Sequence, residues 1–570
     1  MKLIITEKPS VAMMIAEVLG ANKRYDGYLE GNGYQISWCI GHLVSLVPPE
    51  CYDEKYQRWD LNVLPIFPKI FGYQINKSTK QQFYLLKRLM RDPDVTTVVN
   101  ACDAGREGEL IFRLVYQQTK CPKPMKRLWI SSLEEKEIQE GIAHLKEGED
   151  YQDLFDSALA RSQADWLVGM NLSRLYSCLY QSGYSVGRVQ TPTLALIVNR
   201  DESIRNFRKE PYYKVNLNCQ GLNFTSEQLK DKKEALCLFQ SIPNELTIHR
   251  ATIQEKVTKP ERLLDLTTLQ RLSNQLLGLS AKETLDVAQN LYEKKWLTYP
   301  RTDSRYLNTG MEESVKKLLV SRAGFQMSIQ NMSLNFDNDK VSDHHAILPT
   351  LTSLALDKTD LSETEVLIYQ LVFDYTSAAF SEDLIEETVS LTTEIAGHIF
   401  HAKGKVVKQE GYLDYLQSYK KKRLDYDLSH IQADQVFLIT NKDLEEKETQ
   451  PPQHFTEATL LKEMEQAGVE SLDKSLEIER QGLGTSATRA AVIEQLISKE
   501  LIMRDKKSLK ATSKGIALVT VVADFVKDPK TTADWENRLS RIALGQESKA
   551  QFLRDIKQEV ATIIGQYQTS

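Results

Sequence analysis

Near the middle of the chain, residues 296–304 read WLTYPRTDS, with a tyrosine directly before a proline. Pro300 disfavours a helical conformation for the residue that precedes it, so we expect Tyr299 in an extended or turn conformation. A phenol held on a turn can attack a phosphodiester, and the guanidinium of Arg301 can neutralise the charge that develops on the phosphate oxygens. Most tyrosines, however, pack their ring and leave the hydroxyl in water. The segment alone therefore leaves both interpretations open.

Acidic side chains follow two predicted strands in the first part of the chain. Residues 2–5 (KLII) form a short apolar run that ends just before Glu7, and residues 96–100 (TTVVN) lead to Asp103 and an amphipathic helix over 107–118. A strand, a polar turn and a helix, repeated, are typical of an open α/β domain, which binds its ligands at the carboxyl ends of the strands. We therefore expect Glu7 and Asp103 to meet at one crevice.

The rest of the chain alternates between helical and strand patterns. We predict helices over 151–207, strands over 213–217 and 246–253, helices over 263–320, strands over 386–410, and mainly helices from about 455 to the end. This order indicates that the chain leaves domains and later re-enters them. A length of 570 residues is enough for roughly three or four domains.

Composition excludes several classes of protein. A net charge of −6 argues against a protein that coats nucleic acid indiscriminately. The seven cysteines form no CxxC pair, which argues against a zinc ribbon and a disulfide framework. We find neither a signal peptide nor an apolar run of about 20 residues, the length that spans a membrane. We expect a cytoplasmic protein with no membrane contact and no zinc.

Several further segments, in order along almost the whole chain, carry a resemblance to a known family. They are 7–10 (EKPS), 103–109 (DAGREGE), 160–169 (ARSQADWLVG), 185–193 (SVGRVQTPT), 267–270 (TTLQ), 344–350 (HHAILPT), 455–461 (FTEATLL) and 482–489 (GLGTSATR). The first two look like a toprim metal site, which primases and some nucleases share. Together with 296–304, the set closely resembles the type IA DNA topoisomerases, and within them the topoisomerase III branch.

The resemblance implies a role for each residue of the reaction centre. Tyr299 is expected to form a 5′-phosphotyrosine bond and to leave a free 3′-hydroxyl. Lys8 is expected to donate a proton to the leaving sugar oxygen or to steady the phosphate. Glu7 and Asp103 are expected to hold Mg2+, assisted by Glu107. Elsewhere, Lys8 would be interpreted as a solvated surface lysine, and Glu107 as an acid that complements a helix dipole.

The resemblance also implies contacts to DNA. Arg301 is expected to clamp the scissile phosphate, and His344 to relay protons, although a histidine satisfied within the core is the alternative. The residues expected to grip the strand are Arg161 and the loop formed by Ser185, Val186, Gly187, Arg188, Val189 and Gln190. Trp59 could stack on a base, but a packed tryptophan is an equal alternative.

One position departs from the family pattern. The common motif has an acid two residues after its first aspartate, where this chain has Gly105. Losing a carboxylate puts a second metal ion in doubt, so we expect one functional Mg2+, loosely held. The chain also contains no phosphate-binding GxxxxGK loop followed by Ser or Thr, which agrees with a reaction that needs no ATP.

The fold implied by the resemblance is a multi-domain clamp that combines α/β, α and β domains around a central hole. We expect a toprim α/β domain at 1–150, a helical DNA-binding domain at 151–210 and 455–570, a β-rich arch at 211–262 and 386–454, and a helical domain carrying Tyr299 at 263–385. The last domain is expected to lift away so that a strand can pass.

The expected activity is relaxation of negative supercoils and, more characteristically, decatenation through single-stranded DNA. We expect a monomer associated with the nucleoid, with a helicase as a possible partner. The chain ends at Ser570 without a cysteine-rich or basic tail, so we expect salt-sensitive and weak binding to duplex. The alternatives are a toprim nuclease or primase, which leaves no protein–DNA adduct, and a catalytically silent DNA-binding scaffold.

Overall fold

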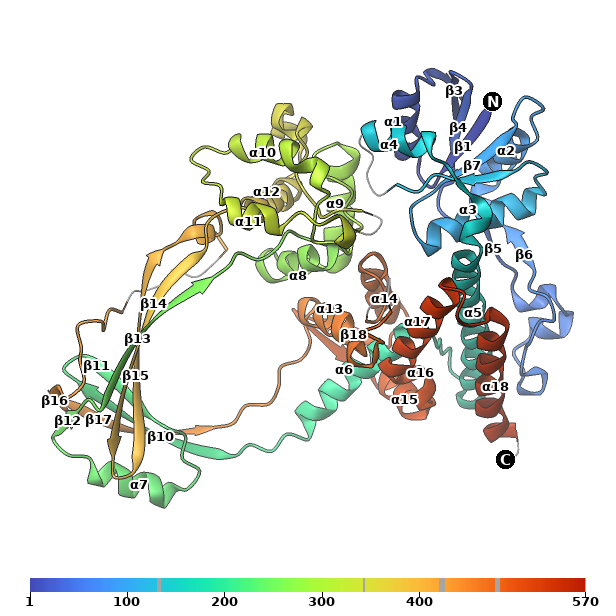
Figure 1. Ribbon diagram of the computed structural model, residues 1–570. Coiled ribbons are helices and arrows are strands. Elements are labelled where there is room, and N and C mark those ends of the chain that lie inside the picture. Colours follow the sequence, from blue (N-terminus) through green and yellow to red (C-terminus); the bar gives the residue numbers. More distant parts are fainter. Residues whose placement is uncertain (131–134, 342–343, 420–425, 477–481, 569–570) are drawn as a thin grey trace.

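The chain forms a ring of packed units. The computed structural model describes residues 1–130, 135–341, 344–419, 426–476 and 482–568. In Figure 1 an N-terminal α/β unit, a helical unit that holds the C-terminus, a β-sheet arch and a second helical unit follow one another around the ring. None of the helices within these residues is long and apolar enough to cross a membrane.

The N-terminal unit is a sheet with helices on both faces. Its elements are β1 (Lys2–Thr6), α1 (Pro9–Leu19), β2 (Lys23–Tyr25), β3 (Tyr28–Gly31), β4 (Tyr34–Trp38), β5 (Val44–Leu46), β6 (Tyr73–Ile75), α2 (Lys80–Met90), β7 (Thr97–Ala101), α3 (Arg106–Thr119), β8 (Met125–Arg127), α4 (Glu135–Ala143) and β9 (Lys146–Glu147). The strand order is β2-β3-β4-β1-β7-β8-β9, and β1 is parallel to both β4 and β7.

Strand β1 is buried on both of its faces. Leu3 and Ile5 share a core with side chains of α2 and α3, whereas Ile4 shares one with side chains of α1 and α4. A strand covered on both sides needs apolar residues at successive positions, which explains the run of Leu3, Ile4 and Ile5, all fully buried. The helix after it ends at Gly20, which adopts a left-handed conformation with φ of 70° that glycine accommodates without strain.

The helical unit combines segments from before and after the arch. Its elements are α5 (Gln152–Tyr180), α6 (Gln190–Arg205), α13 (Glu457–Gln466), α14 (Ser486–Ser498), β18 (Ile502–Asp505), β19 (Ser508–Ala511), α15 (Ser513–Val521), α16 (Asp524–Lys527), α17 (Pro529–Ala543) and α18 (Lys549–Gln568). Buried residues of these helices form one continuous core, which Leu64 and Ile66 also join. The segment between β5 and β6 therefore packs on the helical unit.

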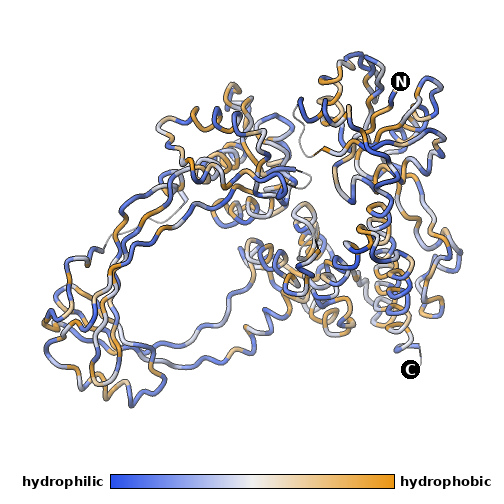
Figure 2. The backbone as a smooth tube through the Cα atoms, in the orientation of Figure 1, coloured by the Kyte–Doolittle hydropathy of each residue, from blue (hydrophilic) through white to orange (hydrophobic). Residues whose placement is uncertain are grey.

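The arch is built around a twisted antiparallel sheet. Its elements are β10 (Pro211–Cys219), β11 (Leu222–Ser226), α7 (Lys232–Ser241), β12 (Glu245–Thr247), β13 (Arg250–Thr258), β14 (Leu384–Ile395), β15 (His398–Gln409), β16 (Val436–Leu438) and β17 (Asn441–Glu448). The main sheet has the order β13-β14-β15-β11-β10-β17. Two mostly hydrophilic segments, 206–210 and 449–454, connect it to the helical unit (Figure 2).

The second helical unit, which we call the tyrosine unit, carries Tyr299. Its helices are α8 (Leu266–Leu276), α9 (Ala281–Glu293), α10 (Glu312–Val320), α11 (Ile329–Leu334) and α12 (Glu363–Ala379). Side chains fix the start of these helices: Asp265 accepts from the Thr268 N–H of α8, and Ser280 and Ser362 form capping boxes at α9 and α12. Such caps satisfy amide groups that have no partner within the helix.

The predicted elements and the observed ones agree except for one strand. The strands predicted at 2–5 and 96–100 are β1 and β7, and the helix predicted at 107–118 is α3. The strand predicted over 246–253 is wrong as a single element, because the chain changes sheet between β12 and β13. Strand β12 pairs with β16, whereas β13 pairs with β14.

Candidate active site

Two strand ends place a lysine and two carboxylates together. Strands β1 and β7 are neighbours in register, with Thr6 opposite Ala101, so Glu7 and Asp103 emerge at the same edge of the sheet. Lys8 Nζ lies 2.5 Å from Asp103 Oδ2 and 3.5 Å from Glu7 Oε1. As expected, Glu7 and Asp103 lie together at one edge of the sheet, where both contact Lys8.

Hydrogen bonds from Arg127 fix the loop that carries Asp103. The buried Arg127 of β8 donates to the carbonyl oxygens of Cys102 and Asp103, both at 2.7 Å. A Cβ atom at position 108 would lie 2.2 Å from the carbonyl oxygen of Asp103, so only glycine fits there. Gly108 thus lets the first turn of α3 approach the loop, which fixes Asp103 relative to that helix.

The tyrosine unit brings Tyr299 against this edge of the sheet. The residue lies outside any helix, as predicted. The centroid of its ring is 4.2 Å from Lys8 Nζ, 4.5 Å from the centroid of the His344 ring and 5.3 Å from that of Tyr292. The Tyr292 hydroxyl lies 3.1 Å from the Ser10 hydroxyl of α1. These contacts join the two units at the site.

The two neighbouring histidines face different ways. His344 Nε2 lies 3.2 Å from Asp103 Oδ2, and its carbonyl oxygen accepts from the Thr302 hydroxyl at 2.8 Å, which ties its segment to that of Tyr299. His345 Nδ1 instead lies 2.7 Å from its neighbour's carbonyl oxygen. Burial lowers the pKa of His345 to about 4, so this ring is neutral near pH 7. His344 is therefore the histidine that faces the site.

Burial and neighbouring charges shift the pKa values of four site residues in different directions. Burial, and then the nearby Asp103 carboxylate, raise the pKa of Glu7 to about 7. Burial alone would also raise the pKa of Asp103, but His344 and Lys8 hold it below its ordinary value. Burial disfavours the Lys8 ammonium, yet the carboxylates of Asp103 and Glu7 raise its pKa well above its usual range. Burial raises the pKa of the Tyr299 phenol, although the positive charges of Lys8 and Arg301 lower it in part.

The residues present fit a magnesium ion held by two carboxylates. Mg2+ in proteins usually keeps several waters and binds one or two carboxylates together with substrate phosphate. The raised pKa of Glu7 beside the ionised Asp103 shows negative charge that a cation would neutralise. Among the described residues, no group of three or more His, Cys, Asp or Glu side chains is placed to hold a metal ion.

Glu107, the third expected ligand, is engaged by other groups in this structure. Its Oε1 lies 2.7 Å from His42 Nε2, and its Oε2 accepts from Arg161 NH2 at 2.8 Å. Burial would raise the pKa of Glu107, but the hydrogen bond to His42 and the charge of Arg161 lower it to about 2. Arg161, an expected DNA contact, thus contacts Glu107, an expected metal ligand.

The loop over 185–190 is closed by its own side chains. Gln190 Nε2 donates to the carbonyl oxygen of Ser185 at 2.6 Å and to its hydroxyl at 2.9 Å. Val186 is buried, and its amide donates to the Ser173 hydroxyl of α5 at 2.9 Å. Gly187 donates to the Thr191 hydroxyl of α6 at 3.0 Å, and Val189 is the residue before that helix. These side-chain hydrogen bonds therefore fix the loop as a defined turn between α5 and α6.

The other expected DNA contacts differ in their surroundings. Arg301 is exposed next to Tyr299. The Arg188 side chain is only 8% exposed, and its guanidinium lies 3.1 Å from Asp165 and 3.2 Å from Glu536. The Trp59 side chain is 51% exposed, and the guanidinium of Arg174 lies 5.4 Å from its ring. Trp59 contacts α5 rather than the carboxylates.

Three neighbours of the site were not foreseen. They are Tyr292, His42 and Glu536. No spacing in the sequence marks them, because each comes from a segment that reaches the site only through packing of whole units.

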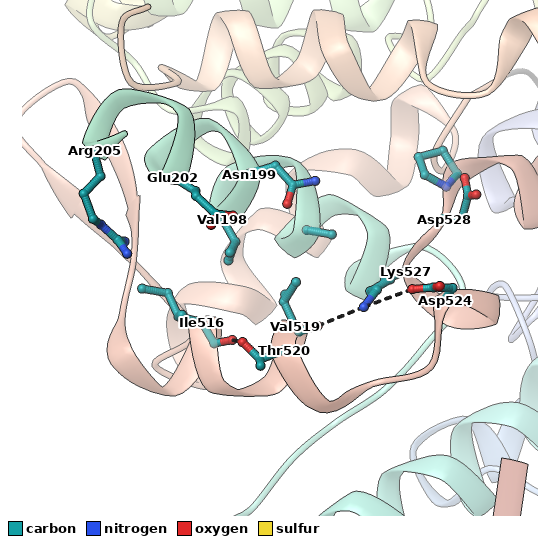
Figure 3. Close-up of a pocket in the computed structure, with 12 residues that line it drawn as sticks. Val198, Asn199, Glu202, Arg205, Ile516, Val519, Thr520, Asp524, Lys527 and Asp528 are labelled. Carbon is teal, nitrogen blue, oxygen red and sulfur yellow. Dashed lines mark hydrogen bonds and ion pairs between the residues drawn. The ribbon is translucent and has the colours of Figure 1, made fainter. Parts of the chain in front are cut away.

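A pocket of about 510 Å3 lies elsewhere in the helical unit, between α6 and α15–α17 (Figure 3). Lys527 lies at one end, where it donates to the carbonyl oxygen of Val519 at 3.3 Å and pairs with Asp524 at 3.1 Å. None of the expected site residues lines this pocket. The expected reaction centre therefore lies outside this pocket.

Comparison with known proteins finds, over almost the whole chain, the family that the sequence motifs resemble. Residues 149–554 match a family described as DNA topoisomerase, and residues 2–133 match the Toprim domain. The chain is 38% identical to DNA topoisomerase 3 of Bacillus licheniformis, across 100% of this chain and 82% of that protein. It is 38% identical to DNA topoisomerase 3 of Bacillus subtilis, across 97% and 80%. Full-length topoisomerase I from Thermotoga maritima has a similar fold, with a TM-score of 0.74 and 23% identity over 99% of this chain and 90% of that one.

Proposed function

The chain belongs to the type IA DNA topoisomerases, in their topoisomerase III branch, and on that premise we propose which of its residues carry out strand cleavage. The enzyme cleaves one DNA strand, passes a strand through the break and reseals it. The family does not favour the alternatives of a nuclease, a primase or a silent scaffold. Its fold is the expected clamp with an N-terminal toprim domain.

Tyr299 is the nucleophile of this proposal. Its phenol oxygen forms a bond to phosphorus as the bond from phosphorus to the 3′ oxygen of the sugar breaks, so the phenol loses a proton and the leaving oxygen gains one. The observation that carries the assignment is the position of Lys8 Nζ between Asp103 Oδ2, at 2.5 Å, and the Tyr299 ring, at 4.2 Å. A phenol beside a fixed cation can ionise more easily as it attacks.

In this proposal Lys8 stabilises negative charge on the phosphate, rather than donating a proton. Because its pKa is raised by Asp103 and Glu7 against the effect of burial, it remains an ammonium ion, which stabilises the negative charge on the phosphate. His344, which faces Asp103, is the group we propose to carry a proton. The exposed Arg301 is proposed to clamp the scissile phosphate from the solvent side.

Glu7 and Asp103 are proposed to bind one Mg2+ ion. The ion would neutralise the two carboxylates and orient a backbone phosphate. Glu107 is proposed as an outer group that keeps Arg161 in place. Resealing reverses the attack, because the phosphotyrosine retains the energy of the phosphodiester. We therefore propose that neither ATP nor zinc takes part.

The tyrosine unit is proposed to open as a gate, within the division into domains expected from the sequence. It is held to the N-terminal unit by contacts of Lys8 and Asp103, and to the helical unit by hydrogen bonds. The Ser486 amide donates to Asp303 at 3.1 Å, Arg489 donates to the Thr267 hydroxyl at 2.8 Å, and the Ala281 amide donates to Glu457 at 2.7 Å. Polar interfaces of this kind favour relative motion of domains.

DNA is the substrate, and single-stranded regions are proposed as the points of entry. The loop over 185–190 and Arg161 are proposed to hold the strand backbone, and Trp59 to stack on a base farther along. We further propose that the enzyme acts as a monomer in the cytoplasm, associated with the nucleoid, and that a helicase supplies single strands.

Peptide mapping of the covalent adduct tests the nucleophile directly. Protein is incubated with a single-stranded oligonucleotide and Mg2+, denatured, and digested with nuclease and trypsin. Trypsin separates residues 296–301 (WLTYPR), with Tyr299, from 283–294 (ETLDVAQNLYEK), with the neighbouring Tyr292. We expect the nucleotide mass on 296–301 and a 3′-hydroxyl on the released fragment that a polymerase can extend. A nucleotide on 283–294, or no adduct, would contradict the proposal.

A further inference from the structure

Helix α17 places a buried carboxylate between two arginines from different units. Glu536 Oε2 accepts from Arg106 NH2 at 2.9 Å, and Glu536 Oε1 accepts from Arg188 NH1 at 3.2 Å. The three side chains are 4%, 3% and 8% exposed, respectively. A carboxylate with one charged donor on each oxygen is a strong geometric constraint on both donors.

The two arginines lie in the two segments that are proposed to act in metal binding and in DNA binding. Arg106 is the first residue of α3 and stands directly before Glu107, three residues after Asp103. Arg188 lies in the loop over 185–190, which is proposed to hold the DNA strand. The segments that carry them belong to the N-terminal unit and the helical unit. Glu536 therefore bridges the metal side and the DNA side of the site.

Helix α17 holds Arg188 by other contacts as well. The Thr532 hydroxyl donates to the carbonyl oxygen of Arg188 at 3.0 Å, and the guanidinium lies 5.1 Å from the centroid of the Trp535 ring. The helix itself is fixed at its start, where Asp528 accepts from the Lys530 amide and Pro529 occupies the first turn. Backbone, ring and carboxylate contacts all come from one face of a short stretch of α17.

The charge on Glu536 is maintained by its surroundings. Burial would raise the pKa of Glu536, but Arg106, Arg188 and Arg161 together hold it below its ordinary value. The group is thus ionised at neutral pH, as two charged partners require. Removing one member of a buried ionic group leaves the other charges uncompensated and drives them to move.

We propose that Glu536 is a positioning residue for strand cleavage: it fixes the start of α3, with Glu107, and the loop over 185–190, with Arg188, at one separation. This inference rests on the proposed roles of those two elements. Glu536 touches neither DNA nor metal and acts through the two arginines. Its loss misplaces the strand relative to the attacking phenol and leaves the strand's attraction to the protein largely intact.

Glu536→Gln separates positioning from binding. The amide keeps the shape of the side chain but can accept at only one oxygen, so one arginine is released. We expect the cleavage rate at saturating single-stranded oligonucleotide to fall about 10- to 100-fold, the loss that a misplacement near 1 Å produces. Affinity should fall little or rise, because losing an acidic group beside a DNA site adds net positive charge. The rate comes from adduct formation, and affinity from fluorescence anisotropy.

The matched control is Glu547→Gln, which removes a carboxylate partner of Arg538 on the same helix and touches neither Arg106 nor Arg188. It should cleave at the wild-type rate. Glu536→Asp keeps the charge but shortens the reach, so its rate should lie between those of Glu536→Gln and wild type. If Glu536→Gln does not fold, a lowered rate for Glu536→Asp carries the inference.

A folded Glu536→Gln protein that cleaves at the wild-type rate when saturated with DNA would overturn the inference, even if its melting temperature is lowered. The same holds for a wild-type rate in Glu536→Asp where Glu536→Gln cannot be obtained. Failure of the proposed function shows itself differently, because the wild-type protein then carries no nucleotide on Tyr299. The two ideas therefore fail independently.

Discussion

The ammonium nitrogen of Lys8 lies 4.2 Å from the centroid of the Tyr299 ring, although the two residues belong to different units of the clamp. The same nitrogen is 2.5 Å from Asp103 Oδ2. The cation thus contacts both a proposed metal ligand and the proposed nucleophile, so it links the toprim domain to the tyrosine unit. In the proposed opening of the gate, Tyr299 and His344 would leave this contact together, because the Thr302 hydroxyl ties their segments.

Replacing Lys8 with Gln should slow adduct formation at saturating oligonucleotide by about 100- to 1,000-fold, the usual loss when one fixed group that stabilises transition-state charge is removed. Binding of the oligonucleotide should change much less. Rates are measured by denaturant quenching at short times. Lys23→Gln, on the exposed strand β2, is the control. A wild-type cleavage rate in the Lys8 variant would remove Lys8 from the mechanism.

Replacing Glu7 with Gln should raise the Mg2+ concentration that gives half-maximal relaxation by at least about tenfold, because the site loses one of two charged ligands. The measurement is a Mg2+ titration of relaxation of a negatively supercoiled plasmid, after chelation of the enzyme. An unchanged titration midpoint would show that the ion is held elsewhere.

Replacing Glu107 with Gln should shift the same titration less than Glu7→Gln does. In the structure the two oxygens of Glu107 face His42 and Arg161, so its main loss is the anchoring of Arg161. We expect the affinity for single-stranded DNA to depend less steeply on salt than in the wild type, because one positioned phosphate contact is lost. Equal shifts of the Mg2+ midpoint in the two variants would instead make Glu107 a direct ligand.

Asp265, the cap of α8 in the tyrosine unit, should make stability depend on pH. Burial raises its pKa from 3.8 to about 6, so the folded protein binds this proton more tightly than the unfolded chain does. The stabilisation is complete below about pH 4 and is lost as pH rises through 6. Asp265→Asn, which keeps the cap, should match wild type at pH 3.5 and be more stable at pH 7.5 by on the order of 3 kcal/mol.

Urea unfolding of the two proteins at both pH values measures this difference. A variant that is less stable than wild type at pH 7.5 would show that the ionised carboxylate, rather than the neutral acid, is the better cap at this position.

The placement of Glu7 and Asp103 at one edge of the sheet, and the conformation of Tyr299, could be predicted from local sequence. Glu7 and Asp103 were placed together because each follows an apolar strand, and parallel neighbours end at the same edge of a sheet. Pro300 indicated a non-helical Tyr299, and the structure agrees. The family motifs supplied the roles of individual residues, which stay predictions until variants are measured.

Other features depend on packing between distant segments, which no local pattern encodes. Glu536 reaches Arg106 and Arg188 only because α17 packs on α5, where the Ser157 hydroxyl donates to the Leu539 carbonyl at 2.7 Å. The strand predicted over 246–253 is two strands because each half pairs with a different partner. In the same way, only the docked tyrosine unit shows that the ring centroid of Tyr292 lies 5.3 Å from that of Tyr299.

Trapping of labelled DNA on Tyr299→Phe and Tyr292→Phe tests the central claim most directly. Each variant and the wild type are mixed with a single-stranded oligonucleotide labelled on the 3′ side of the cleavage point, with Mg2+, and denatured. We predict label on the wild type and on Tyr292→Phe, and none on Tyr299→Phe. Label that remains on Tyr299→Phe, or that is lost only from Tyr292→Phe, would contradict the account.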